Sequence, residues 1–122
     1  MTNTEKELDR LVQRLADHQY CLACAKISGI RKQAECIHHA ITRANMMLRY
    51  EIANLYPLCL ECHRKVHDGQ IDQKDFIDPT VWEWLNKVKN QSYKDYLIHE
   101  LGGITKQEHL RQCKKTIQNY LK

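Results

Sequence analysis

The sequence has little glycine and less proline, with four and two residues among 122. Linker-rich and disordered chains are enriched in these residues, so the composition argues against both classes. No apolar run reaches the roughly 18 residues of a membrane-spanning helix, so we expect no membrane partner. The first ten residues, MTNTEKELDR, are polar and acidic, unlike a secretory signal peptide. We therefore expect a single cytoplasmic domain over residues 1–122.

The chain also lacks a large excess of one charge: it has 19 lysines and arginines and 15 acidic residues, which gives a net charge of +4. That excess permits nucleic-acid binding without arguing strongly for it. The six cysteines are not expected to form a disulfide framework, because the cytoplasm keeps thiols reduced. Four of them form two CxxC pairs, a spacing typical of metal sites.

Apolar residues at helical spacing predict an amphipathic helix over residues 4–17, with Thr4 and Glu7 as its capping box. Two short strands are expected, at 34–41 and at 55–58. Pro57 confines the second strand to a sheet edge, because proline cannot donate a ladder hydrogen bond. A loop is expected over 26–32, and a long connection with room for a helical turn over 42–53.

Residues 78–122 are predicted to be a helical extension. Its three helices are indicated by three S/T-x-x-D/E patterns that read as capping boxes. The fold class is therefore α+β and mostly α, with an N-terminal helix, a small central core and a helical C-terminal tail. The three capping pairs are Thr80 and Glu83, Ser92 and Asp95, and Thr105 and Glu108.

The two CxxC pairs predict a structural Zn²⁺ held by four thiolates, a donor set suited to tetrahedral zinc. Because the pairs lie far apart in the chain, this ion would join two ends of one core. The alternative is four reduced thiols packed as small hydrophobic groups. The remaining cysteines have apolar neighbours and are interpreted as core thiols. The expected ligands are Cys21, Cys24, Cys59 and Cys62, and the core thiols are Cys36 and Cys113.

A second group of polar residues lies between and just after the two CxxC pairs. His63 and His67 are four residues apart on a helix expected over residues 63–68, so their imidazoles share one face. His38 and His39 are adjacent in an expected strand and point to opposite sides. One of them can complete a metal site with the helix, and the other is left for chemistry. Asn54 precedes the second strand.

The pattern HHxxT…Asn…LCxxCHxxxH resembles the HNH (ββα-metal) endonuclease motif in its zinc-knuckle form. The resemblance covers residues 21–69 and implies a treble-clef-like ββα-metal core. It also implies that the protein is a hydrolase cleaving phosphodiester bonds of DNA. His38, His63 and His67 would bind a catalytic Mg²⁺, Mn²⁺ or Zn²⁺, and His39 would be the general base. Asn54 would orient His39 or reach the metal.

The segment TRANMMLRYEIAN lacks the glycines that many HNH nucleases have before the asparagine. Its arginine and LRYxxxN stretch resemble recombination nucleases of the phage NinG/Rap type. That resemblance implies DNA recombination in a phage or prophage context, where junction resolution would favour a homodimer. Arg43 and Arg49 would contact phosphates flanking the cut, or they are solvated loop charges.

Two other classes of function compete with a nuclease. A non-catalytic, zinc-dependent nucleic-acid-binding module would use the histidines for a second, closed zinc site. A protein-interaction adaptor would use the helix carrying Trp82 and Trp84 as a docking face. These tryptophans are two residues apart and cannot share one helical face.

Overall fold

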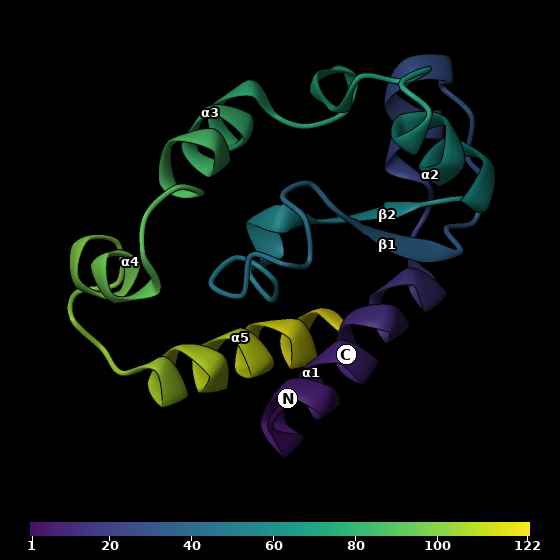
Figure 1. The fold of residues 1–122 in the computed structure, drawn as a ribbon. Helices are drawn as coiled ribbons and strands as arrows, with labels where there is room; N and C mark the ends of the chain where they lie inside the picture. Colours follow the sequence, from purple (N-terminus) through teal and green to yellow (C-terminus); the bar gives the residue numbers. More distant parts are fainter.

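The computed structural model describes residues 1–122 as an α+β fold that is mostly helical, with one small two-stranded sheet. In Figure 1 the helices surround the sheet and the connection between its strands. None of the helices combines the length and the apolar character that a membrane span requires. The elements are α1 (Asn3–Arg14), β1 (Cys36–His39), β2 (Leu55–Leu58), α2 (Leu60–His67), α3 (Pro79–Val88), α4 (Tyr93–His99) and α5 (Lys106–Tyr120), with short 3₁₀ turns at Leu15–His18, Ile52–Asn54 and Gln73–Asp75.

The sheet pairs β1 with β2 in antiparallel fashion, with His38 opposite Tyr56 and His39 opposite Leu55. The second strand has the predicted bounds. The first is shorter than the predicted 34–41, because the chain turns away from β2 just after His39. At that turn the backbone N–H of Ile41 donates to the side chain of Asn54 instead of a strand partner.

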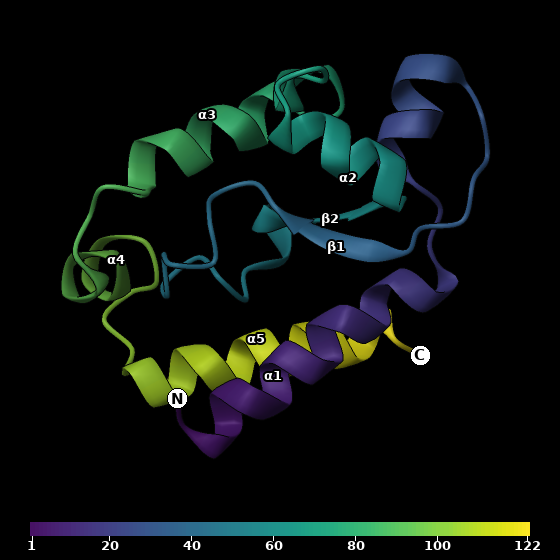
Figure 2. The same cartoon turned by 45° about the vertical axis from the view of Figure 1, so that its right-hand side comes forward.

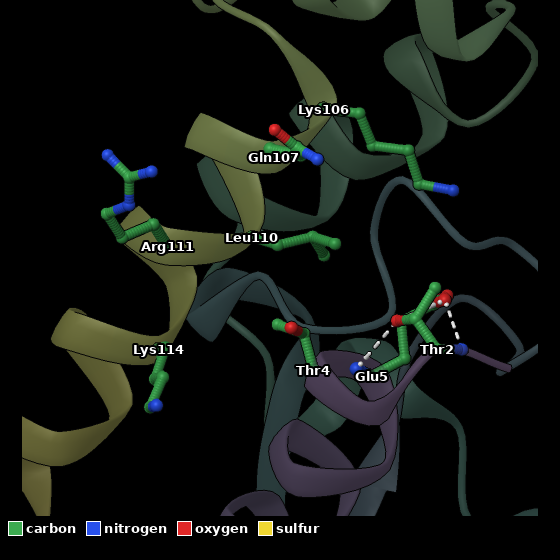
Figure 3. A pocket seen from close by; sticks show the side chains of 8 residues that line it. All are labelled: Thr2, Thr4, Glu5, Lys106, Gln107, Leu110, Arg111 and Lys114. Carbon is green, nitrogen blue, oxygen red and sulfur yellow. Dashed lines mark hydrogen bonds between the residues drawn. The ribbon is translucent and has the colours of Figure 1, made fainter.

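The N-cap of helix α1 lies two residues earlier than predicted. Thr2 is its N-cap and forms the capping box with Glu5, whose carboxylate accepts from the Thr2 backbone (Figure 3). The predicted pair at Thr4 and Glu7 is therefore wrong, although the sequence spacing is the same. Glu7 instead forms an ion pair with Lys114 of α5, at 2.9 Å.

The C-terminal tail contains the three predicted helices, and two of the predicted N-caps are confirmed, without the reciprocal side-chain bond of a capping box. Ser92 and Thr105 accept hydrogen bonds from the backbone at the third position of α4 and α5. The predicted cap at Thr80 is wrong, because Asp78 caps α3 and Pro79 is the first helical residue. Proline favours that position, since its fixed φ suits a helix and its missing N–H would have no partner there.

Two local predictions near the cysteines need correction. Part of the expected 26–32 loop is a π-helical turn, Cys24–Ser28, which Gly29 ends with φ of 64°. Helix α2 starts at Leu60, earlier than predicted, because Cys59 is its N-cap and its sulfur accepts from the Cys62 N–H. The second CxxC pair therefore forms the start of the helix that carries His63 and His67.

The interior contains two hydrophobic clusters, and the connection between β1 and β2 contributes to both. Met47 and Leu48 belong to the cluster under the cysteines, α3 and α4. Tyr50 belongs to the cluster between α1, α5 and the sheet. Figure 2 shows the connection in the middle of the fold, with α1 and α5 side by side below it.

Candidate active site

Four cysteine sulfurs from two separate segments meet at one point. The sulfurs of Cys21, Cys24, Cys59 and Cys62 all lie within 4.8 Å of one another. The Sγ of Cys24 is 3.9 Å from that of Cys59 and 3.6 Å from that of Cys62. Sulfurs around a tetrahedral zinc lie about 3.8 Å apart, given Zn–S bonds of about 2.3 Å. This cluster can therefore hold a zinc ion.

Backbone donors contact two of these sulfurs, whereas burial favours the neutral thiol at the other two. The backbone N–H groups of Cys24 and Cys62 donate to the sulfurs of Cys21 and Cys59, at 3.4 Å each. Burial raises the pKa of the Cys24 thiol and of the Cys62 thiol. A zinc ion would offset that cost, because it binds the thiolate form.

Three histidines form a second cluster, between β1 and α2. One ring nitrogen from each of His38, His63 and His67 lies within 4.8 Å of the others. The Nε2 atoms of His63 and His67 are 3.1 Å apart, and the ring centroids of His38 and His63 are 5.3 Å apart. Burial lowers the pKa of His38 and of His63, which favours the neutral imidazoles that bind cations.

Gln73 contacts this cluster and was not predicted from the sequence. Its Oε1 lies 2.8 Å from His38 Nε2, and His38 is buried. Because an amide oxygen only accepts, this contact places a proton on Nε2 and leaves Nδ1 with the lone pair. Gln73 starts a 3₁₀ turn after α2, and no spacing in the sequence connects it with the histidine pair.

His39 lies beside this cluster but is not part of it. Its Nε2 is 3.1 Å from the backbone carbonyl of Arg49, and the same groove is lined by His38, His39, Arg43, His63 and His67. A carbonyl oxygen can only accept, so His39 donates from Nε2 and keeps its lone pair on Nδ1. Burial and the neighbouring Arg43 lower the pKa of His39 to about 4. The ring is therefore neutral at pH 7.

The Asn54 side chain is fully buried, and all its hydrogen bonds go to the backbone. Its Oδ1 accepts from Ile41 N at 2.6 Å, and its Nδ2 donates to the carbonyls of Ile41 and Leu48 at 3.0 Å each. Asn54 was expected to orient His39 or to reach the metal, and its side chain is hydrogen-bonded to neither. It joins the two ends of the connection between the strands, and this connection carries the carbonyl that holds His39.

The two predicted phosphate-binding arginines differ in their surroundings. Arg43 is exposed and lines the histidine groove. Arg49 is mostly buried, and its guanidinium donates to both carboxylate oxygens of Asp9, at 3.0 and 2.9 Å. The side chain of Arg49 is therefore engaged within the fold. Its prediction as a DNA contact needs correction, whereas Arg43 remains free to contact a ligand.

Several surface hollows have similar volumes, and one of them contains the four histidines of the predicted site. The histidine groove has a volume of about 470 Å³. A pocket of about 580 Å³ lies between the first turns of α1 and α5, where Figure 3 shows Lys106, Arg111 and Lys114 around it. Lys114 and Arg111 are paired with Glu7 and Glu108. The basic side chains of this pocket are thus largely neutralised, and it holds none of the histidines.

Trp82 and Trp84 are both half-buried and pack on the first hydrophobic cluster. Their helix, α3, therefore uses these side chains within the fold. An adaptor that docks partners through exposed tryptophans on this helix has no support in this arrangement.

Comparison with known proteins agrees with this geometry in the central part of the chain. Residues 19–69 match the HNH endonuclease family. This HNH segment is less than half of the 122 residues, and it includes the four clustered cysteines, the four histidines of the groove and Asn54. The match supports a nuclease-type function. No curated protein and no solved structure matches the chain.

Proposed function

We propose that the protein is a metal-dependent DNA endonuclease that hydrolyses phosphodiester bonds, with its reaction centre in the histidine groove. One observation carries this proposal: three histidines converge on one point, while the adjacent His39 stays outside that cluster. Such a division separates cation binding from proton transfer, which are the two tasks that phosphodiester hydrolysis requires.

His39 is proposed as the general base. Its Nε2–H is held by the Arg49 carbonyl, so Nδ1 is the atom that accepts a proton from water. The hydrogen bond also fixes the ring orientation, which lets the nitrogen act without reorienting. Arg43 lines the same groove, and its positive charge disfavours protonation of His39. The Arg43 side chain is also free to contact a DNA phosphate.

His38, His63 and His67 are proposed to hold the catalytic divalent cation, which is Mg²⁺, Mn²⁺ or Zn²⁺. When bound, the cation supplies Lewis-acid stabilisation of the charge that develops on the phosphate. The Gln73 amide oxygen accepts from His38 Nε2, and such a bond typically orients a metal-binding imidazole. The groove at these histidines is open to the surface, which suits a catalytic site better than a closed structural one.

The four cysteines are proposed to hold a structural zinc with no part in the reaction. Cys59 and Cys62 lie at the start of α2, and Cys21 and Cys24 precede β1, so one ion joins the helix to the sheet side of the core. This connection would keep the histidines of α2 opposite His38. Preorganisation of this kind is needed in a small domain whose hydrophobic core is modest.

The finer biological assignment rests on the connection between the strands. Its arginine and LRYEIAN stretch resemble NinG/Rap-type nucleases, and we propose DNA recombination in a phage or prophage, in the cytoplasm of a bacterial host. A homodimer is proposed for the case that the substrate is a four-way junction, because two strands must then be cut.

The test uses wild type and His39→Ala on linear duplex, nicked and four-way-junction DNA, with Mg²⁺, Mn²⁺, Zn²⁺ or EDTA. We expect cleavage by wild type with at least one cation and none in EDTA. His39→Ala should lose cleavage while DNA affinity and melting temperature stay close to wild type. Absence of cleavage by wild type with every substrate and cation would favour a nucleic-acid-binding module. Retained cleavage by His39→Ala would remove the general-base assignment.

A further inference from the structure

Three consecutive residues shortly before β2 each make a side-chain hydrogen bond or ion pair with a helix outside the HNH segment. Arg49 and Tyr50 are bonded to α1, and Glu51 is bonded to α5. These residues belong to the connection between the strands, which otherwise consists of turns and one 3₁₀ turn. A connection without regular structure needs such external contacts to hold one conformation.

On the α1 side, the contacts are a two-point ion pair and a buried hydrogen bond. Both Asp9 carboxylate oxygens accept from the Arg49 guanidinium, and the two side chains are 24% and 12% exposed. Paired, parallel bonds of this kind also fix geometry, because both partners are planar. The Tyr50 hydroxyl donates to the Glu5 carbonyl at 3.1 Å in a buried position.

On the α5 side, a buried hydrogen-bond chain receives Glu51. Its Oε1 accepts from His109 Nε2 and, at 3.3 Å, from the thiol of Cys113. His109 is 2% exposed, and its Nδ1 is 2.6 Å from the hydroxyl of Tyr93. Glu51, His109 and Cys113 have donor types that could bind a cation. Here, however, their polar atoms are already paired with one another and with Tyr93.

The atom that holds His39 lies within this three-residue segment. The Arg49 carbonyl accepts from His39 Nε2, and it belongs to the first of the three bonded residues. We propose that α1 and α5 act as a clamp on residues 49–51, and that Asp9 and His109 are positioning residues for His39 through that carbonyl. The catalytic part of this inference rests on the proposed nuclease function.

In this proposal, helices α1 and α5 hold the connection between the strands in one conformation. His109 is 58 residues from Glu51 in sequence, so α5 must pack on the core before the connection is held. A displacement of about 1 Å in a catalytic group can cost about a hundredfold in rate. Loosening the clamp should therefore affect turnover more than substrate binding.

The experiment compares Asp9→Asn and Glu51→Gln with a matched control, Lys114→Ala. Both test variants keep the side-chain shape and remove a charge from the clamp. Lys114→Ala breaks the ion pair with Glu7, which also joins α5 to α1 but does not contact residues 49–51. Hydrogen–deuterium exchange of residues 40–54 is measured first, because it does not depend on activity.

We expect faster exchange over residues 40–54 in both test variants and wild-type exchange in Lys114→Ala. At saturating DNA, kcat should fall about tenfold or more in the test variants, with KM and bound metal unchanged. Wild-type exchange in both test variants would overturn the clamp, whether or not the protein cleaves DNA. Faster exchange with unchanged kcat in an active enzyme would overturn the positioning role.

Two further results distinguish the clamp from the proposed nuclease function and from a metal site at the same residues. If wild type cleaves no DNA, the proposed function fails, and the exchange data alone decide whether the clamp exists. Metal analysis of the purified protein tests whether Glu51, His109 and Cys113 are hydrogen-bonded to one another or bind a metal ion. A third bound metal that is lost in Cys113→Ala would replace the hydrogen-bonded junction with a metal site and overturn the inference in its present form.

Discussion

Replacing Asn54 with alanine should destabilise the protein strongly, although the side chain makes no hydrogen bond to another side chain. The amide makes three backbone hydrogen bonds and is fully buried. Each such bond contributes about 1 kcal/mol, and the backbone groups of Ile41 and Leu48 would be left without partners. We therefore expect a loss of about 3 kcal/mol in the free energy of unfolding. For a chain of this size that corresponds to roughly 10 °C in Tm.

The assay is urea unfolding of the metal-loaded protein, with Asn45→Ala as the matched control. Asn45 lies in the same connection and donates to the Lys89 carbonyl at 3.0 Å in an exposed position. Water can replace that bond, so its loss should cost less than about 1 kcal/mol. Equal effects of the two substitutions, or a loss below about 1 kcal/mol in Asn54→Ala, would refute the claim that the buried amide holds this connection in place.

Three further predictions concern the zinc, the arginines and pH. Cys59→Ser should lose one zinc per chain and unfold or aggregate; a normal Tm with full metal content would contradict the structural-zinc assignment. Arg43→Ala should keep the wild-type Tm and lower the salt dependence of DNA binding by the amount that corresponds to about one phosphate contact. Arg49→Ala should instead lower the Tm. The reverse pattern would contradict both assignments. Burial lowers the folded-state pKa of His39 to about 4, so the unfolded chain binds more protons than the folded protein between about pH 6.5 and 4. The free energy of unfolding should therefore fall as pH falls through that window. Thermal unfolding from pH 4 to 8 checks this, and a flat profile would contradict it.

The sequence contained enough information to predict the elements that carry the site, because their signals are local. The CxxC spacing, the HxxxH spacing and Pro57 correctly indicated a sulfur cluster, a histidine face on α2 and a short edge strand. Helix ends were less certain, since Thr2-x-x-Glu5 and Thr4-x-x-Glu7 are equivalent patterns. Only the structure distinguishes them, through the contact of Glu7 with Lys114.

The contacts that orient the site could not be predicted, because they join residues far apart in sequence. Gln73 meets His38 across 35 residues, and Arg49 meets Asp9 across 40. The hydrogen-bond partners of Asn54 could not be predicted for a related reason. A motif asparagine suggests a side-chain or metal partner, whereas the fold directs its amide to the backbone at Ile41 and Leu48.

The most direct test of the account is a titration of Mn²⁺ into zinc-loaded protein, comparing His38→Ala with His39→Ala. The two residues are neighbours in β1, but only His38 has a ring nitrogen within the cluster formed with α2. We predict that His39→Ala binds Mn²⁺ with the affinity of wild type, and that His38→Ala binds it at least about tenfold more weakly. Equal loss of affinity in both variants, or loss only in His39→Ala, would contradict the division of tasks between the two histidines.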